Sequence, residues 1–196
     1  MAKRYWLETL GCPKNQVDSD KLEGTLLAAG YRSAPDPGEA DVVVVNTCAF
    51  IEDARAESVD AVLGMAEVRA EGAELVVTGC LAQRAGDELA EAIPEIDRVA
   101  PFGADRLGRG APAPGSAIGA AVPVSLGRRP TGIGTDAAAV PDMDLLELRR
   151  PASSSPWAYV KIAEGCDRAC GFCAIPGFRG PQRSRPIEAI ADEVDA

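Results

Sequence analysis

The segment Asp41-Val42-Val43-Val44-Val45-Asn46 holds the longest purely aliphatic run of the chain, and a helix-like stretch follows it. The same order, a short apolar run and then a helical stretch, occurs once before this segment and once after it. Valine-rich runs that alternate with helices are typical of βαβ units, whose strands form a parallel sheet. We therefore predict an α/β domain with a parallel sheet over residues 1–100. The predicted strands are residues 5–10, 41–46, 74–78 and, more weakly, 96–99, and the predicted helices are residues 19–29, 51–70 and 82–93.

Residues 101–156 differ in composition from the first hundred residues, because they hold 8 of the 15 prolines and 8 of the 20 glycines. We interpret this Ala/Gly/Pro-rich stretch as a connector with one short apolar-periodic piece at 143–148. Order is expected to resume with a strand at 157–163. Trp157 and Tyr159 alternate along that strand, so we expect both side chains to face a core.

Residues 157–196 are expected to form only the start of a second domain. A loop rich in glycine, cysteine and proline follows the strand, and a helix begins at Pro186 with Glu188 in its first turn. One strand, one loop and one helix cannot bury a core. We therefore expect the chain to be a fragment of a longer protein.

The composition narrows the possible chemistry. The chain of 196 residues contains six cysteines and no histidine, which excludes Ser-His-Asp triads, Cys-His pairs and zinc sites that use imidazole. The basic N-terminus has no apolar stretch behind it, and no run approaches the ~20 apolar residues of a membrane span. We therefore expect a cytoplasmic protein without membrane contact, in which cysteines serve metal or redox chemistry rather than disulfides.

The negative charge is concentrated in the first half of the chain. The formal net charge is −10, and residues 1–100 carry 9 basic and 19 acidic side chains. Such a surface is a poor match for nucleic acid, which rewards clustered Lys and Arg. Direct nucleic-acid binding by this fragment is not expected, and a basic protein partner would fit better.

Three cysteines follow the three main predicted strands. Cys12, Cys48 and Cys80 are separated by 36 and 32 residues, about one βα unit each. Parallel strands end at one edge of their sheet, so these thiols should converge there. The small neighbours Gly11 and Gly79 would leave room for an inorganic group. The alternative is three unrelated buried cysteines.

A second group of cysteines, Cys166, Cys170 and Cys173, follows the predicted strand at 157–163. A structural zinc site needs four ligands, and the spacing differs from that of bacterial ferredoxins. Three thiolates would leave a cubane iron–sulfur cluster with one open iron, as a catalytic centre requires. A disulfide knot and a zinc knuckle with a borrowed ligand are the alternatives.

The spacing of the second group, with Phe172 before its last cysteine, is the motif of the radical S-adenosylmethionine (SAM) enzymes. Further stretches resemble the methylthiotransferases of that superfamily, over residues 5–100 and 157–196. The motif Gly11-Cys-Pro-Lys-Asn15 is similar to that of the branch that modifies a ribosomal protein. In the tRNA-modifying branch, the corresponding motif is usually Gly-Cys-Gln-x-Asn. The stretches that carry the resemblance are Thr9–Asn15, Asn46–Ile51, Thr78–Arg84, Lys161–Arg168, Cys173–Gly180 and Arg183–Pro186.

The resemblance implies two four-iron, four-sulfur clusters and an N-terminal methylthiotransferase domain followed by the beginning of a partial TIM-type barrel. The first three cysteines would hold an auxiliary cluster. The second three, with Phe172 beside them, would hold a cluster whose open iron binds SAM. The resemblance further implies a reducing electron donor such as a flavodoxin or ferredoxin. The substrate that it implies is an aspartate of the twelfth protein of the small ribosomal subunit.

Two other functions stay open at this point. One is methylthiolation of a tRNA adenosine by an enzyme of the same architecture. The other is a non-catalytic iron–sulfur module for electron transfer or sensing. Because the resemblance also implies that most of the barrel is absent, we expect the fragment itself to be inactive.

Several polar residues near the cysteines have simpler expected roles. Asn15 and Asn46 are predicted to form hydrogen bonds at strand ends rather than to bind metal. Asp18 and Asp20 are predicted to stabilise a helix start. For Arg179, Arg183 and Arg185 two interpretations remain equal, contact with anionic groups of SAM or substrate, and a solvated basic turn.

Overall fold

The computed structural model describes residues 2–101, 144–153 and 155–196, and its first part forms a five-stranded parallel sheet in the order β2-β1-β3-β4-β5. The predicted α/β fold with a parallel sheet is therefore confirmed. The strands are β1 (Arg4–Thr9), β2 (Arg32–Ser33), β3 (Val42–Thr47), β4 (Glu74–Gly79) and β5 (Arg98–Ala100). The connecting helices are α1 (Pro13–Ala28), the short 3-10 helix η1 (Pro37–Glu39), α2 (Glu52–Val68) and α3 (Cys80–Ala92).

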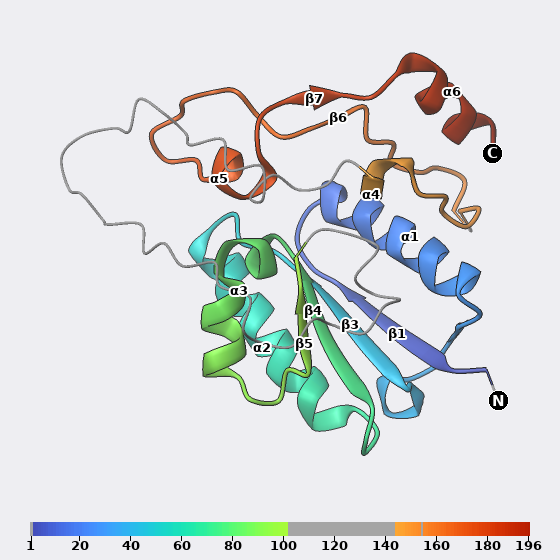
Figure 1. Ribbon diagram of the computed structural model, residues 1–196, viewed down its shortest axis with the longest axis vertical. Helices are drawn as coiled ribbons and strands as arrows, with labels where there is room; N and C mark the ends of the chain where they lie inside the picture. Colours follow the sequence, from blue (N-terminus) through green and yellow to red (C-terminus); the bar gives the residue numbers. More distant parts are fainter. Residues whose placement is uncertain (1, 102–143, 154) are drawn as a thin grey trace.

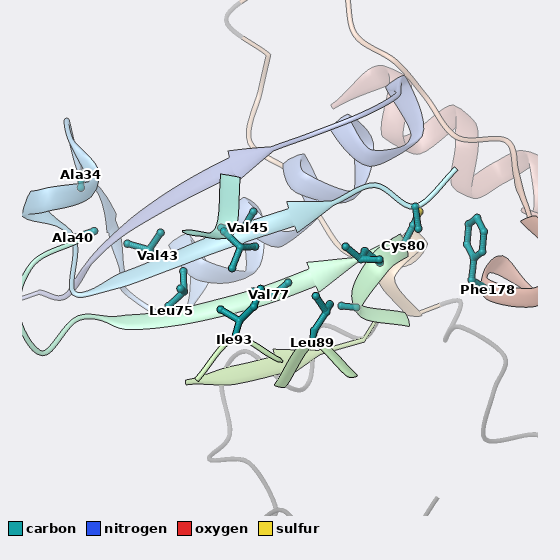
Figure 2. Close-up of a cluster of buried hydrophobic side chains, with 14 residues drawn as sticks. Ala34, Ala40, Val43, Val45, Leu75, Val77, Cys80, Leu89, Ile93 and Phe178 are labelled. Carbon is teal, nitrogen blue, oxygen red and sulfur yellow. The ribbon is translucent and has the colours of Figure 1, made fainter. Parts of the chain in front are cut away.

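The valine run of β3 lies at the centre of the sheet and is buried throughout. Alternate side chains point to opposite faces of a strand. Val43 and Val45 accordingly join the core cluster beneath α2 and α3, which Figure 2 shows together with Leu75 and Val77 of β4. Val42 and Val44 join the cluster on the α1 side. An uninterrupted apolar run is required here because helices cover both faces (Figure 1).

Helix α1 begins at Pro13, six residues before the predicted start at residue 19. Proline is favoured at the first helical position because its missing N–H would have no partner there. Asp18 consequently lies in the second turn, buried, so its predicted role at a helix start is wrong. Helix α3 likewise begins at Cys80 itself rather than at residue 82.

The predicted strand at 157–163 is largely absent. Only β6 (Ala163–Glu164) forms, and it pairs antiparallel with β7 (Arg183–Ser184). Trp157 is 61% and Tyr159 44% exposed, so their predicted place in a core is wrong. Their rings instead pack edge to face with centroids 5.1 Å apart. Alternation along a strand implies a core only where neighbouring strands complete a sheet, and here none flanks these residues within the described parts of the chain.

The remaining elements are α4 (Asp144–Glu147), α5 (Ile175–Arg179) and α6 (Ile187–Asp195). Helix α6 follows Pro186 and has Glu188 in its first turn, as predicted. Helix α4 falls inside the apolar-periodic piece of the predicted connector, whereas residues 102–143 and 154 lie outside the described residues. None of the described helices combines the length and apolar character that crossing a membrane requires. The segment from β6 to α6 lies along the edge at which β1, β3 and β4 end (Figure 1).

Candidate metal centres

The first three cysteines all lie at the carboxyl edge of the sheet. Cys12 precedes α1 as its N-cap, Cys48 follows β3 directly, and Cys80 is the first residue of α3. Cys12 is exposed, whereas Cys48 and Cys80 are buried, and all three are free thiols. The parallel topology thus brings three segments far apart in sequence to one edge.

Two glycines allow these segments to approach one another. Gly11 has φ +91°, and a Cβ there would lie 2.7 Å from Cβ and 2.8 Å from Sγ of Cys48. Gly79 has φ +93°, and a Cβ there would lie 2.4 Å from the Thr47 carbonyl oxygen. Both positions require glycine, because a side chain would be strained and would also overlap its neighbour.

Asn15 ties the ends of two strands together beneath the cysteines. Its Nδ2 donates to the carbonyl oxygens of Leu10 and Thr47, each at 2.9 Å. Asn46, near the end of β3, links that strand to α1. Its Nδ2 donates to the Asn15 carbonyl and to Ser19 Oγ, each at 2.9 Å. Both asparagines are fully buried, and the prediction that they form strand-end hydrogen bonds is confirmed.

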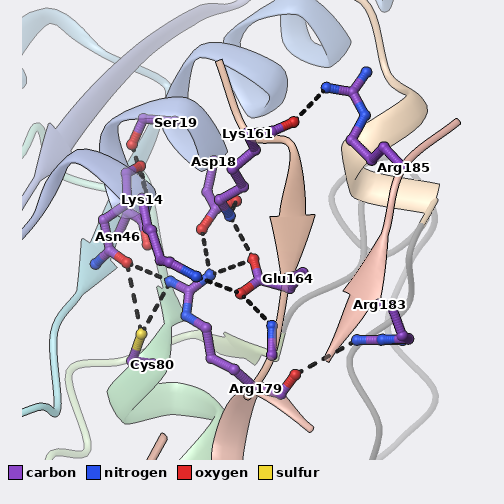
Figure 3. Close-up of polar contacts among 12 residues, drawn as sticks. Lys14, Asp18, Ser19, Asn46, Cys80, Lys161, Glu164, Arg179, Arg183 and Arg185 are labelled. Atoms are coloured by element: carbon purple, nitrogen blue, oxygen red, sulfur yellow. Dashed lines mark hydrogen bonds and ion pairs between the residues drawn. The ribbon is translucent and has the colours of Figure 1, made fainter. Parts of the chain in front are cut away.

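The buried guanidinium of Arg179, at the end of α5, reaches the first cysteine group from the C-terminal segment (Figure 3). Its Nη2 lies 3.1 Å from Cys80 Sγ and 2.6 Å from Asn15 Oδ1. Its Nη1 donates to Asp18 Oδ2 at 3.0 Å and to Glu164 Oε2 at 2.8 Å. The two carboxylates therefore fix the guanidinium beside the thiol.

Lys161 completes this group of buried charges. Its ammonium donates to Asp18 and, at 2.6 Å, to Glu164 (Figure 3). Two cations and two anions therefore share one buried site, so that no net charge is left without a partner. Lys161 and Glu164 lie within the stretch Lys161–Arg168 that carries the family resemblance, which was the available signal for their importance.

The ionisation of this cluster follows from its burial and its partners. Burial raises the pKa of the Cys80 thiol to about 11, although the adjacent Arg179 opposes this effect. Burial alone would raise the pKa of Glu164, but Arg179 and Lys161 outweigh it and lower the pKa to about 2. Burial alone would lower the pKa of Arg179, but Asp18, Cys80 and Glu164 raise it. Arg179 and Glu164 are therefore charged at neutral pH.

The second cysteine group lies in the loop between β6 and α5. Cys166 and Cys173 are half-buried and Cys170 is exposed. The Cys166 N–H donates to the Gly180 carbonyl at 3.1 Å, which closes the loop at its base. Phe172 is 90% exposed. Within the described ranges, no three cysteine or carboxylate side chains surround a single ion position.

The three arginines of the C-terminal segment do not form a solvated basic turn. Arg179 is buried as described, and buried Arg185 donates to the Lys161 carbonyl at 2.8 Å and pairs with Glu193 at 2.7 Å. Arg183 is half-buried and donates to the Arg179 carbonyl at 3.5 Å. The buried contacts of Arg179 and Arg185 instead hold the C-terminal segment against the rest of the protein.

Fold and site together define a class, α/β proteins with one cysteine triplet at the carboxyl edge of a parallel sheet and a second in a loop packed beside that edge. The chain belongs to the family described as "Uncharacterized protein family UPF0004", whose model matches residues 4–101.

Two proteins named "Ribosomal protein uS12 methylthiotransferase RimO" are similar to this chain. The protein from Anaeromyxobacter sp. (strain K) is 46% identical over 202 residues, covering 100% of this chain and 39% of the relative. The one from Myxococcus xanthus (strain DK1622) is 42% identical over 197 residues, covering 97% of this chain and 38% of the relative. The predicted resemblance to the methylthiotransferases is confirmed, and the chain spans about two fifths of the length of these relatives.

Proposed function

We propose that this chain is part of a radical SAM methylthiotransferase that adds a methylthio group to the β-carbon of an aspartate in ribosomal protein uS12. The observation that carries the proposal is the contact between the segment that contains the second cysteine triplet and a cysteine of the first. Arg179, which follows the second triplet, contacts Cys80 of the first at 3.1 Å. A reaction that joins a carbon radical to a sulfur donor needs two reactive centres held near each other. The name of these relatives, which refers to uS12, supports this choice of substrate.

The residues present fit two iron–sulfur clusters. Cys12, Cys48 and Cys80 would hold the auxiliary four-iron, four-sulfur cluster, and their thiols are free. Gly11 lets the backbone approach the Cys48 sulfur, and Gly79 lets it approach β3, which leaves room for a bulky inorganic group. Three thiolates per cubane leave one iron without a protein ligand.

Cys166, Cys170 and Cys173 would hold the second cluster, with SAM at its open iron. When bound, the clusters and SAM supply the carbon-centred radical and the methylthio group. The chain's own residues hold the centres in place. Arg179, Glu164 and Lys161 fix the base of the second loop on α1, and Phe172, whose ring is exposed in that loop, would contact the bound SAM.

The organisation proposed for the chain is a methylthiotransferase domain at residues 1–100, a connector at 101–156 and the start of the radical SAM domain at 157–196. The last segment packs on the first through buried charges. A cytoplasmic location and reduction by a flavodoxin or ferredoxin complete the proposal, because the clusters must be reduced for radical chemistry.

The test is mass spectrometry of ribosomal protein uS12 and of tRNA nucleosides from a strain that lacks the gene for the whole protein. We expect uS12 to lose the mass of its methylthio group while tRNA adenosines stay unchanged. Restoring the gene should return the modification, and restoring it with Cys166→Ala should not. A loss confined to tRNA would support the tRNA-modifying alternative instead.

A separate measurement addresses the non-catalytic alternative. SAM added to the reduced, reconstituted protein should change the electron paramagnetic resonance spectrum of a cluster with an open iron. A spectrum that SAM leaves unchanged would point to fully ligated clusters and so to electron transfer or sensing.

A further inference from the structure

Arg179 joins two parts of the chain that contribute different cysteines. It belongs to α5, which begins two residues after Cys173 of the second group. Its guanidinium nevertheless lies 3.1 Å from the sulfur of Cys80, in the first group. Only 3% of Arg179 is exposed, so this contact is inside the protein.

The position of the guanidinium is fixed by partners on both of its terminal nitrogens. Asp18 and Glu164 accept hydrogen bonds from Nη1, while Asn15 accepts from Nη2 at 2.6 Å. The planar fork of arginine can serve these acceptors and a sulfur at the same time, whereas the ammonium of lysine cannot match this geometry. The carboxylates also balance the charge of Arg179, so the cation is stable in the interior.

We propose that Arg179 is a positioning residue for the first cysteine group, whose guanidinium donates a hydrogen bond to the Cys80 sulfur and raises the reduction potential of the auxiliary cluster. The inference rests on the proposed function, because it requires a cluster on Cys12, Cys48 and Cys80. Reduction makes a cluster more negative, and a cation and hydrogen bonds at its sulfur ligands favour the reduced form.

The contact also makes the auxiliary site sensitive to the segment that carries the second site. Glu164 precedes Cys166 by two residues and Arg179 follows Cys173 by six, so both ends of the second loop are anchored in the same cluster of charges. Displacement of this loop would withdraw the guanidinium from Cys80. The potential of the auxiliary cluster thereby depends on correct packing of the radical SAM segment.

The experiment uses the full chain with Cys166, Cys170 and Cys173 replaced by alanine, so that only the first group can bind a cluster. Arg179→Met removes the cation and the donor, and Arg179→Gln keeps an amide donor without charge. Arg183→Met is the matched control, because Arg183 lies in the same segment and donates to the backbone carbonyl of Arg179. Each variant is reconstituted anaerobically and titrated electrochemically while its spectrum is recorded.

We expect Arg179→Met to lower the ratio of reduced to oxidised cluster about tenfold at a fixed applied potential, which is about 59 mV for a one-electron couple. Arg179→Gln should give a smaller shift in the same direction, and Arg183→Met should change the ratio less than about twofold. Loss of iron from a folded Arg179→Met chain, with folding checked by circular dichroism, would also support the positioning role.

Two results would overturn the inference, and they are distinguishable. A folded, loaded Arg179→Met or Arg179→Gln chain with the potential of its parent would show that the contact has no effect on the cluster, while the proposed function would stand. Absence of any cluster from the parent chain would remove the proposed auxiliary site and the inference together.

Discussion

Asn15 shows how one side chain can hold an edge of a sheet together. Its amide nitrogen satisfies the carbonyl oxygens that follow β1 and end β3, while its Oδ1 accepts from Arg179 and lies 3.5 Å from Cys80 Sγ. Buried polar groups are costly when they lack partners. One residue therefore stabilises the ends of two strands and the arginine that reaches them.

Replacement of Asn15 by leucine should lower the free energy of unfolding by about 2–4 kcal/mol, because two buried carbonyls lose their donor. Chemical denaturation of the metal-free, reduced chain measures this change. The control is Gln16→Leu, because Gln16 is exposed and, among the described residues, its side chain donates to Asp20 on the next turn. Equal effects of the two substitutions would contradict the role given to Asn15.

The roles of single residues could be predicted from sequence where the backbone position determines them. Asn15 and Asn46 adjoin strand ends, where free carbonyls need donors, and the prediction was correct. Trp157 and Tyr159 were placed in a core wrongly, because alternation does not reveal whether a strand has neighbours. The burial of Arg179 was not predictable, since its partner Asp18 is 161 residues away.

At the scale of elements, the ends of β1, β3 and β4 determine the geometry of the first cysteine group. Cys48 and Cys80 directly follow β3 and β4, Cys12 follows the end of β1 by three residues, and each following helix starts within a few residues. These tight transitions depend on backbone conformations that only glycine adopts without strain. Gly79 is the most constrained, because β3 lies against the position its Cβ would take.

Gly79→Ala should destabilise the chain by more than about 3 kcal/mol, through positive φ and overlap with the backbone of Thr47. Two alanine substitutions separate these causes. Gly72 has φ +82° and open space, so its replacement should cost about 1–2 kcal/mol. Gly64 lies within α2 with open space, so its replacement should stabilise by about 0.5–1 kcal/mol. Thermal unfolding of the three variants measures the order, and a Gly79→Ala chain no less stable than Gly72→Ala would contradict it.

The regular elements of the first hundred residues were predictable because apolar residues recur with clearly different spacings in strands and in helices. The valine run identified β3, and its repetition identified the parallel sheet. The two-residue strand β2 and the short helix α5 were not found, because such pieces have too few residues for a period. The start of α1 was missed because Pro13 was not recognised as its first residue.

At the scale of the whole molecule, two groups of buried charges attach the C-terminal segment to α1. One contains Asp18, Lys161, Glu164 and Arg179, and the other pairs Lys21 of α1 with Glu193 of α6 at 2.7 Å. Removing one partner of a buried pair leaves a charge without compensation. The attachment is therefore specific for this arrangement of the two segments.

Asp18→Asn should lower the free energy of unfolding by about 3–5 kcal/mol, because Lys161 and Arg179 then lack one of their two anions. Asp20→Asn is the control on the same helix. Asp20 is partly exposed and lies 3.4 Å from Arg150, so its loss should cost less than about 1 kcal/mol. Denaturant titration of both variants checks the difference, and a cost for Asp18→Asn within the control's range would refute the role of the buried cluster.

The depressed pKa of Glu164 predicts a loss of stability in acid. In the folded chain the pKa is about 2, against 4.5 for the free group, so its contribution is complete above about pH 5 and is lost as the pH falls towards 2. Stability of the metal-free chain should fall more steeply below pH 5 than that of Glu164→Gln. If stability depended on pH in the same way for the two chains, the neighbours of Glu164 would not be lowering the pKa of its carboxyl group.

How the C-terminal segment packs could not be predicted from sequence, although both cysteine groups could be. The spacing of Cys166, Cys170 and Cys173 is local, and the first group follows from parallel topology. The contacts between the segments join residues such as Asp18 and Lys161, 143 positions apart, which no local pattern relates. Only the three-dimensional structure reveals that an arginine of the C-terminal segment contacts Cys80 of the first cysteine group.

We propose that the chain carries two separate iron–sulfur sites with three cysteines each. Iron and acid-labile sulfide per chain, measured after anaerobic reconstitution, test it most directly. We predict about eight irons for the unaltered chain, and about four when either Cys12, Cys48 and Cys80 or Cys166, Cys170 and Cys173 are replaced by alanine. A chain that binds no iron, and instead forms disulfides or binds zinc stoichiometrically, would contradict the claim.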